Sequence, residues 1–253
     1  MNDQSLFDGK IASVAGSGRG IGRAIALHVA RQGAQIVVNF FRNRSRAEGM
    51  AAAIRKLGHQ ALLVKANVGT DDGLDHLFSE VEKHFGALDI MICNAASGYN
   101  RPALQQKPRG WDWTMNSLLF ATQRAVPLMG KRGGGAIVSI SSPGSFRVLP
   151  DYVVVGASKA ALEALTRYLA VELAEKNIIV NAVSPGIAKT EALHHFDSAQ
   201  REGLIDSVIS RTPAGRLVTP EDIAQVVAFL CGPAASMIRG QVILIDGGFT
   251  LLE

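Results

Sequence analysis

The chain has 253 residues, of which 47% are hydrophobic and 19% are charged. That balance is typical of a globular protein and excludes a disordered or fibrous one. The formal net charge is +4 at pH 7, which is compatible with a phosphorylated ligand. Without a run of basic residues, however, this charge does not indicate nucleic-acid binding.

Short apolar runs alternate with longer amphipathic stretches along almost the whole chain. The predicted strands cover residues 11–15, 35–40, 60–66, 88–93, 136–141, 178–184 and 241–245. The predicted helices cover residues 21–32, 44–57, 71–85, 112–130, 152–176 and 220–231. Apolar strands that alternate with helices are typical of a parallel sheet with both faces covered. We therefore expect an α/β fold in which residues 1–253 form a single Rossmann-like domain, a doubly wound parallel sheet of about seven strands.

Residues 186–219 interrupt this alternation. The segment contains the pair His194-His195 and has only weak hydrophobic periodicity. It follows a predicted strand, and ligands of open α/β sheets bind beyond the carboxyl ends of the strands. We therefore predict that 186–219 forms a substrate lid, the alternative being an ordinary surface excursion.

Signals for export, membrane insertion and metal binding are absent from the sequence. No apolar run reaches the roughly 18 residues of a membrane span, and the first residues resemble no signal peptide. The two cysteines, Cys93 and Cys231, are too few for a disulfide framework or a zinc site. We expect a cytoplasmic protein without membrane insertion and without a bound metal.

A glycine-rich turn follows the first predicted strand and leads directly into the first predicted helix. Its glycines are Gly16, Gly20 and Gly22, so the dinucleotide spacing G-x-G-x-x-G fails, because its third glycine would fall at Ile21. A turn without obstructing side chains allows a pyrophosphate to lie on the amino terminus of a helix, where free N–H groups favour anions. We therefore predict a nucleotide site at this turn. Its residues are Gly16, Ser17, Arg19, Gly20, Ile21 and Gly22.

The residues after the second strand indicate which dinucleotide is bound. NAD sites usually place Asp or Glu there, where it accepts a hydrogen bond from the ribose 2′-hydroxyl. This chain has Asn39 and then Arg42, and Arg19 lies in the glycine turn. Guanidinium groups hold a 2′-phosphate that a carboxylate would repel. We therefore predict NADPH as the cofactor.

Motifs along the whole chain resemble those of short-chain dehydrogenases/reductases. Besides the glycine turn, they are Asn67-Val68, Asn94-Ala95-Ala96, Asn116, Ser141-Ser142, Lys159, Pro185-Gly186 with Thr190, and Asp246-Gly247-Gly248. Small departures occur at Ala15, Cys93 and Ala96, where the family usually has Thr, Asn and Gly. The resemblance implies that Asn67, Val68, Asn94, Ala95, Pro185, Gly186 and Thr190 contact the cofactor. It also implies that Lys159 holds the ribose hydroxyls and that Asn116 supports a relay behind this lysine.

One departure lies at the position of the catalytic tyrosine. The usual family pattern, Tyr-x-x-x-Lys, requires a tyrosine at position 155, where this chain has Val155. The nearby tyrosine is Tyr152, which is separated from Lys159 by six residues. That spacing resembles the enoyl-acyl-carrier-protein reductases, and stretches such as 65–69, 111–116 and 158–173 resemble their NADPH-dependent FabL class.

The wider spacing also has a geometric meaning that does not depend on the resemblance. In ketone reduction the carbonyl carbon receives the hydride and the oxygen bonded to it receives the proton. In enoyl thioester reduction the β-carbon receives the hydride, and the negative charge appears on the thioester oxygen, which is farther away. Moving a helical tyrosine from four to seven residues before the lysine shifts it by roughly 4.5 Å and returns it to nearly the same face. Tyr152 is therefore predicted to stabilise the developing enolate, with Ser142 as an auxiliary group.

Three functions are compatible with these residues. The first is NADPH-dependent reduction of the trans-2,3 double bond of an enoyl thioester carried on acyl carrier protein or coenzyme A, in fatty-acid or related acyl-chain synthesis. The second is reduction of a 3-ketoacyl or other carbonyl group through Ser142 and Tyr152. The third is non-catalytic NADPH binding in regulation.

The resemblance and the predicted helix surfaces also suggest partners. The resemblance implies a homo-oligomer, with a tetramer as the family expectation, and small residues near Ala160 and Ala164 suit close helix packing. A basic rim could attract an acidic carrier protein, the alternative being ordinary surface charge. The rim residues are Arg124, Lys131, Arg132 and Arg167.

Overall fold

The computed structural model describes residues 5–95, 102–105, 117–190 and 198–252. Seven strands form one parallel sheet in the order β3-β2-β1-β4-β5-β6-β7. The strands are β1 (Ile11–Val14), β2 (Gln35–Phe40), β3 (Ala61–Lys65), β4 (Ile90–Cys93), β5 (Gly135–Ile140), β6 (Ile178–Pro185) and β7 (Val242–Ile245). This order is that of a Rossmann-like doubly wound sheet, and the predicted fold class is confirmed.

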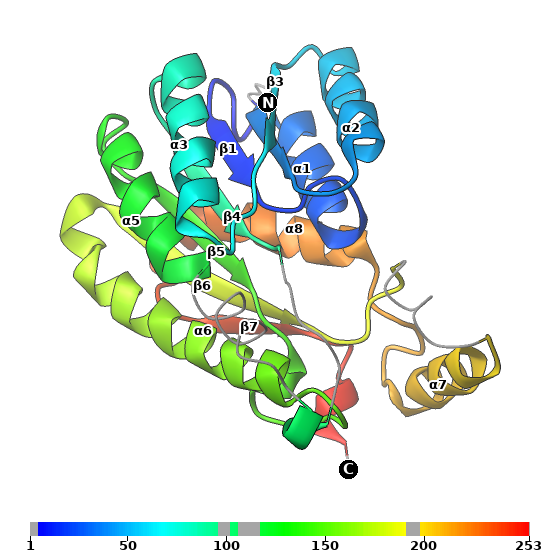
Figure 1. Cartoon of the computed structure of the whole chain (residues 1–253). Helices are drawn as coiled ribbons and strands as arrows, with labels where there is room; N and C mark the ends of the chain where they lie inside the picture. Colours follow the sequence, from blue (N-terminus) through cyan, green and yellow to red (C-terminus); the bar gives the residue numbers. More distant parts are fainter. Residues whose placement is uncertain (1–4, 96–101, 106–116, 191–197, 253) are drawn as a thin grey trace.

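Helices cover both faces of the sheet (Figure 1). One face carries α1 (Gly20–Arg31), α2 (Arg44–Lys56) and α8 (Pro220–Cys231). The other face carries α3 (Asp71–Phe85), α5 (Ser117–Gly130) and α6 (Val153–Glu172). The remaining elements are α7 (Ser198–Arg211) and the short 3₁₀ helices η1 (Ala103–Gln105), η2 (Pro143–Ser145), η3 (Ala174–Lys176), η5 (Pro233–Ala235) and η6 (Phe249–Leu251).

Each face of the sheet has its own hydrophobic core. Ile25, Ile36 and Ile223 are fully buried between the sheet and the α1–α2–α8 layer. Leu74, Leu118 and Ile137 are fully buried on the α3–α5–α6 side. Strands buried on both faces must be apolar at nearly every position, and for this reason the strands stand out in the sequence as continuous apolar runs.

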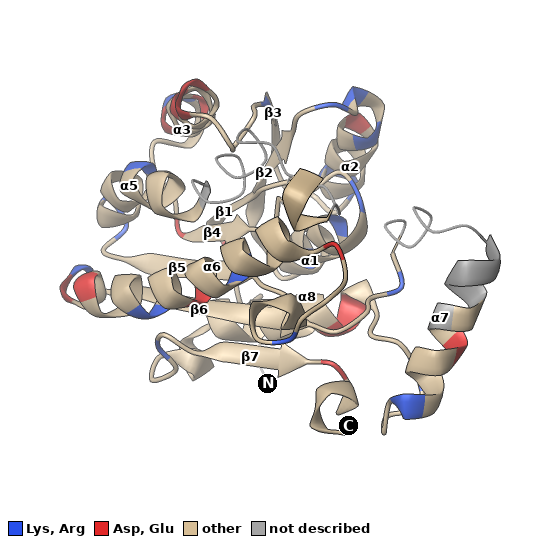
Figure 2. Cartoon of the chain, turned by 60° about the horizontal axis from the view of Figure 1, so that its bottom comes forward, with Lys and Arg blue, Asp and Glu red and all other residues tan. Residues whose placement is uncertain are grey.

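The predicted and observed elements differ at two places. The helix predicted over 152–176 ends at Glu172 and is followed by η3, which ends where Asn177 takes the left-handed conformation (φ 54°). Helix α7 lies inside the segment predicted as an irregular lid, and Figures 1 and 2 both show it standing off from the main body. The start of the helix predicted over 112–130 lies outside the described residues, as do His194 and His195.

The predicted basic rim is largely neutralised by acidic partners. Arg124 on α5 binds Asp75 and Asp71 on α3, at 2.6 and 3.3 Å. Lys131 binds Glu82 at 2.8 Å. Figure 2 shows the acidic residues of α3 beside the basic residues of α5. These ion pairs join α3 to α5 and favour the alternative that Arg124 and Lys131 are ordinary surface charges.

The structure also bears on the question of membrane insertion. In the ranges described above, no helix combines the length and the apolar character needed to cross a bilayer.

Asp89 organises the amino-terminal end of the sheet, opposite the glycine turn. Its carboxylate is buried and accepts hydrogen bonds from the Ile11 backbone N–H (3.0 Å), the Lys10 ammonium (3.0 Å) and the Arg132 guanidinium (3.2 Å). Asp89 thereby joins the loop before β4, the start of β1 and the segment after α5.

We predict that Asp89→Ala lowers the free energy of unfolding by about 2–3 kcal/mol, because a buried N–H and two cations lose a charged acceptor. Chemical denaturation followed by circular dichroism measures this change. Glu48→Gln is the control, since its partner Arg44 is exposed, and it should leave the unfolding midpoint nearly unchanged. Equal effects of the two substitutions would contradict the role assigned to Asp89.

Candidate active site

The glycine turn lies where β1 ends and α1 begins, at the point where the strand order reverses between β1 and β4. Gly16 and Gly20 have φ values of +67° and +52°, which side chains rarely tolerate. A Cβ on Gly22 would lie 2.6 Å from the Gly16 carbonyl oxygen and 2.5 Å from Asn94 Nδ2. The spacing Gly16-x-x-x-Gly20-x-Gly22 is therefore required by both backbone conformation and close packing.

The amino terminus of α1 is suited to an anionic group. The first backbone bond into the helix runs from Arg23 N–H to the Arg19 carbonyl, so the N–H groups before Arg23 have no acceptor within the helix. No acidic residue stands in the first turn. The hydroxyl of Ser17 is buried and has no hydrogen-bond partner among the described residues. Unpaired donors at a helix amino terminus fit a pyrophosphate.

Asn39 supports this turn from behind. It is 2% exposed, its Oδ1 accepts from the Gly16 N–H, and its Nδ2 donates to the carbonyls of Val64 and Ala66. With these groups engaged, we expect Asn39 to hold the turn against β3 rather than to touch the cofactor, which modifies the prediction of a direct contact. Arg42 is exposed just beyond β2, and Arg44 forms an exposed ion pair with Glu48.

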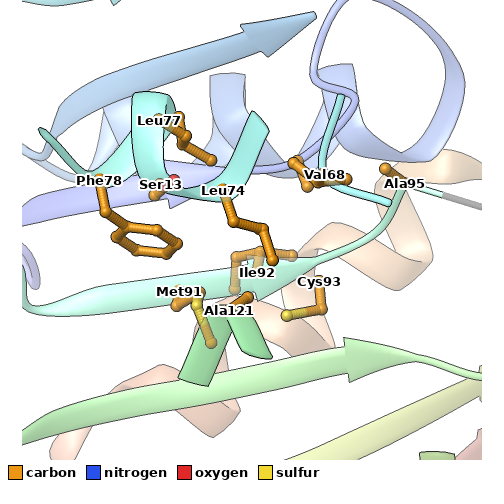
Figure 3. A pocket seen from close by; sticks show the side chains of 11 residues that line it. Ser13, Val68, Leu74, Leu77, Phe78, Met91, Ile92, Cys93, Ala95 and Ala121 are labelled. Carbon is orange, nitrogen blue, oxygen red and sulfur yellow. The ribbon is translucent and has the colours of Figure 1, made fainter. Parts of the chain in front are cut away.

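Val68 and Ala95 lie together beyond the ends of β3 and β4 (Figure 3). They line one end of a small apolar cavity of about 20 Å³ whose wall includes Leu74 and Phe78 of α3. That volume is near the size of a single water molecule, so a flat aromatic ring would have to lie over these side chains rather than inside the cavity. The Asn67 side chain accepts from the Gly69 N–H at 3.1 Å and shapes the turn that holds Val68.

The loops after β4 and β6 approach the glycine turn from the other side. Asn94 Nδ2 donates to the Ala15 carbonyl at 2.9 Å and so joins the ends of β4 and β1. The Thr190 side chain lies against Gly20, since a Cβ there would be 3.8 Å from Thr190 Cβ. Pro185 ends β6, and a Cβ on Gly186 would lie 2.9 Å from Asp246 Cβ. These residues bring the predicted cofactor contacts of three loops to one edge of the sheet.

Lys159 is buried on α6, with 9% of the residue exposed. Its Nζ donates to the Ile140 carbonyl at the end of β5, at 2.7 Å. Burial lowers the pKa of Lys159 to about 8, while Cys93 and Glu163 act in the opposite direction. Burial also raises the pKa of Cys93 to about 12, so that its thiol is uncharged near neutral pH.

Tyr152 immediately precedes α6, which begins at Val153. Its carbonyl accepts the first helical hydrogen bond, from the Gly156 N–H at 2.6 Å. Asp151, the residue before it, has a φ of +58°. The helix predicted from residue 152 therefore starts one residue later, and Tyr152 caps it with a non-helical backbone, seven residues before Lys159. Val155, at the usual family position of tyrosine, is buried.

The Tyr152 hydroxyl donates toward Ser142 Oγ at 3.4 Å, and Ser142 Oγ also accepts from the Gly144 N–H at 3.3 Å. The aromatic ring lies against Gly144, where a Cβ would be 2.5 Å from Tyr152 Cε1. A Cβ on Gly156 would lie 2.7 Å from the Gly144 carbonyl oxygen. Two glycines thus make space for the ring and bring the two hydroxyls together.

The sequence motifs do not identify Gly144 and Gly156 as residues of the site. The signal that could have identified them is their spacing from Tyr152, at eight residues before it and one helical turn after it. Asn116, which the family resemblance places behind Lys159, lies outside the described residues, as does the rest of the stretch 111–116.

Comparison with known proteins shows which family the chain belongs to. A family model described as "Enoyl-(Acyl carrier protein) reductase" matches residues 15–250. The chain is 36% identical over 247 residues to 1-cyclohexenylcarbonyl-CoA reductase of Streptomyces collinus, an alignment that covers 96% of this chain and 88% of that protein.

Two solved structures are similar over nearly their full lengths. A 7α-hydroxysteroid dehydrogenase in complex with NADH and 7-oxo glycochenodeoxycholic acid has a TM-score of 0.91 and 33% identity, with 98% of this chain and 97% of that chain covered. L-sorbose reductase of Gluconobacter frateurii, in complex with NADPH and L-sorbose, has a TM-score of 0.88 and 31% identity, with 97% and 98% covered. The chain therefore belongs to the short-chain dehydrogenase/reductase superfamily and is an oxidoreductase that uses a nicotinamide cofactor.

Proposed function

We propose that this protein is an NADPH-dependent enoyl thioester reductase of the enoyl-acyl-carrier-protein reductase type, closest to the FabL class. The observation that carries the proposal is the seven-residue register between Tyr152, the residue that caps α6, and Lys159 within that helix, with buried Val155 at the position that a ketone reductase fills with tyrosine. The match to the enoyl reductase family model and the similarity to 1-cyclohexenylcarbonyl-CoA reductase, whose name contains an unsaturated acyl thioester, support it.

The described residues fit NADPH at the edge of the sheet. The pyrophosphate would lie on the amino terminus of α1 with the Ser17 hydroxyl as an additional donor. The adenine ring would lie over Val68 and Ala95, and Arg19 and Arg42 would face the 2′-phosphate. Thr190, Pro185 and Gly186 would border the nicotinamide end. When bound, NADPH supplies the hydride.

The protein's own side chains would then manage the charge on the substrate. As the double bond accepts a hydride at its β-carbon, negative charge moves to the thioester oxygen, and the Tyr152 hydroxyl donates a hydrogen bond to it. Lys159 holds the ribose hydroxyls through its ammonium group. Ser142 Oγ already accepts from Tyr152 and from the Gly144 N–H, so its own proton is free to turn toward the substrate as an auxiliary donor.

The proposal includes the carrier, the assembly and the location of the enzyme. The acyl chain would be carried on acyl carrier protein or coenzyme A in fatty-acid or related acyl-chain synthesis, by a cytoplasmic homo-oligomer, with a tetramer as the expected form. Residues 186–219, with α7 as their central helix, would act as the lid over the acyl chain. The paired state of Arg124 and Lys131 gives no support to carrier docking on the α5 surface.

One observation favours a second function, the reduction of a carbonyl group. The Tyr152 and Ser142 hydroxyls are 3.4 Å apart, close enough for both to donate to one carbonyl oxygen. The similar 7α-hydroxysteroid dehydrogenase and L-sorbose reductase were solved with ligands that their descriptions name as a 7-oxo compound and a sugar. In that case Tyr152 would act from seven residues before Lys159 instead of the usual four, together with Ser142.

A paired substrate assay distinguishes the two functions. We predict that NADPH oxidation with crotonyl-coenzyme A has a kcat/KM at least about tenfold above that with acetoacetyl-coenzyme A, a difference of about 1.4 kcal/mol in transition-state binding. Replacement of NADPH by NADH should lower the rate. Turnover of the keto substrate alone would overturn the enoyl proposal.

Substitution of the two hydroxyl residues refines that test. Tyr152→Phe should lower kcat on the enoyl substrate by about 100-fold or more, because the developing charge loses its donor. Ser142→Ala should be tolerated by an enoyl reductase but should abolish the activity of a carbonyl reductase. Loss of enoyl turnover in Ser142→Ala alone would contradict the auxiliary role of this serine.

Gly144 provides a test of how tightly Tyr152 must be held. We predict that Gly144→Ala lowers kcat by about 100-fold, because the new methyl group displaces the ring from its position. NADPH affinity, measured by the fluorescence of the bound dinucleotide, should remain near the wild-type value. Gly49→Ala on α2, where a Cβ meets no atom within 4 Å, is the matched control, and equal activity of both variants would contradict the prediction.

The pH dependence follows from the charge of Lys159. Its ammonium form donates to the ribose hydroxyls, and burial lowers its pKa to about 8. We therefore predict that kcat/KM for NADPH is steady below pH 8 and falls as the pH rises through this value, since the proton is lost in that direction. Steady-state kinetics across the pH range measure the profile. A profile that stays flat well above pH 8 would indicate that the charged lysine is not needed.

A further inference from the structure

Glu163 lies one helical turn beyond Lys159 on α6 and reaches the end of β5. Its Oε1 accepts a hydrogen bond from the Ser141 hydroxyl at 2.6 Å. Ser141 is buried, with 4% of the residue exposed, and Glu163 is half-buried. A distance of 2.6 Å is typical of a hydroxyl that donates to a charged carboxylate. This contact is therefore a charge-assisted bond between the helix and the strand end.

A second bond lies directly beside the first. Lys159 Nζ donates to the carbonyl of Ile140, the residue before Ser141. The successive residues Ile140 and Ser141, at the end of β5, therefore bind Lys159 and Glu163, which are one turn apart on α6. The next residue along the chain is Ser142, whose Oγ faces the Tyr152 hydroxyl. A change at Glu163 would consequently be transmitted to both hydroxyls of the site.

Glu163 also supplies negative charge to a buried cation. Among the described residues, the titratable groups that act on Lys159 are Cys93 from β4 and Glu163 from its own helix. Burial raises the pKa of Cys93 to about 12, so this thiol is neutral near pH 7 and cannot balance the ammonium. The neighbouring end of β5 contributes only neutral groups, the Ile140 carbonyl and the Ser141 hydroxyl. Among the described residues, Glu163 is therefore the negatively charged side chain that favours the charged form of Lys159.

We propose that Glu163 is a positioning residue for the reaction, which keeps Lys159 charged toward the cofactor and fixes the strand end that carries Ser142. Glu163 touches neither substrate nor cofactor and acts through Lys159 and Ser141. The proposal rests on the proposed binding of NADPH by Lys159, but it does not depend on whether an enoyl or a carbonyl group is reduced. It gives the Lys-x-x-x-Glu spacing of 159–163 a role at the site.

The test uses NADPH binding by the whole protein as a function of pH, followed by the fluorescence of the bound dinucleotide. Glu163→Gln keeps the length of the side chain and an acceptor oxygen for Ser141 but removes the charge. We expect the alkaline fall in NADPH affinity to begin about one pH unit lower than in the wild type, because Glu163 favours the charged form of Lys159 and its negative charge is lost in this variant. At pH 8, where half of the wild-type Lys159 is charged, the affinity should therefore be about fivefold weaker than in the wild type, with little difference in mildly acidic buffer.

Three further variants separate charge from structure. Glu163→Asp keeps the charge but shortens the reach to Ser141, so the pH profile should stay near the wild type while kcat falls. Ser141→Ala removes the hydroxyl and should give the same result. Glu172→Gln, on the exposed end of the same helix, should change neither quantity. Unfolding midpoints measured in parallel identify any variant that fails to fold.

The possible outcomes are distinct. A wild-type protein that does not bind NADPH would contradict the proposed function and with it this inference. A second outcome is that the wild type binds NADPH and loses affinity at alkaline pH, and that Glu163→Gln loses affinity at the same pH. This result would overturn the role of Glu163 alone. If Glu163→Gln does not fold, the pH profile of NADPH affinity in Glu163→Asp decides. A shift of one pH unit would overturn the role of Glu163, whereas an unshifted profile with a reduced kcat would support it.

Discussion

The buried ammonium of Lys159 is the constraint on which the geometry of the site depends. A charge removed from water is unfavourable unless it is paired and hydrogen-bonded. Here the partners are the Ile140 carbonyl at 2.7 Å and the nearby Glu163 carboxylate, which itself accepts from Ser141. Because these partners lie where α6 meets the end of β5, satisfying one cation fixes the position of the helix along the sheet. Every residue on α6 then has a position determined by its distance in sequence from Lys159.

The number of residues between the tyrosine and Lys159 therefore bears on which reaction the site can catalyse. A phenol four residues before the lysine lies near the hydride donor, whereas one seven residues before it lies roughly 4.5 Å farther along the helix on nearly the same face. Tyr152 lies at the very start of α6, where the chain would otherwise be free to turn. Its carbonyl bond to Gly156 and the contact of its ring with Gly144 keep it in helical register. The position of the phenol is therefore held from both the backbone and the ring.

Much of this arrangement could be predicted from the sequence, where one physical signal dominates. The order of strands and helices follows from apolar periodicity, and the turn at Gly16 follows from the need for positive φ and close packing. Helix α7 could not be predicted, because its apolar residues form only a weak stripe, and of its described side chains Val208 alone is buried. The partners of Arg124 and the inward orientation of Asn39 also escaped prediction, because they depend on which helix or strand lies opposite, which the sequence pattern does not specify.

The inward orientation of Asn39 has a consequence for cofactor choice. A carboxylate at this position could accept from the Gly16 N–H, but it would present no donor to the carbonyls of Val64 and Ala66, which now receive the amide protons. Two buried carbonyls would then face a buried charge, an arrangement that is strongly unfavourable. Position 39 is therefore unfavourable for the acidic residue of an NAD site. In the proposed NADPH site, the discrimination would come from the cations Arg19 in the glycine turn and exposed Arg42 beyond β2.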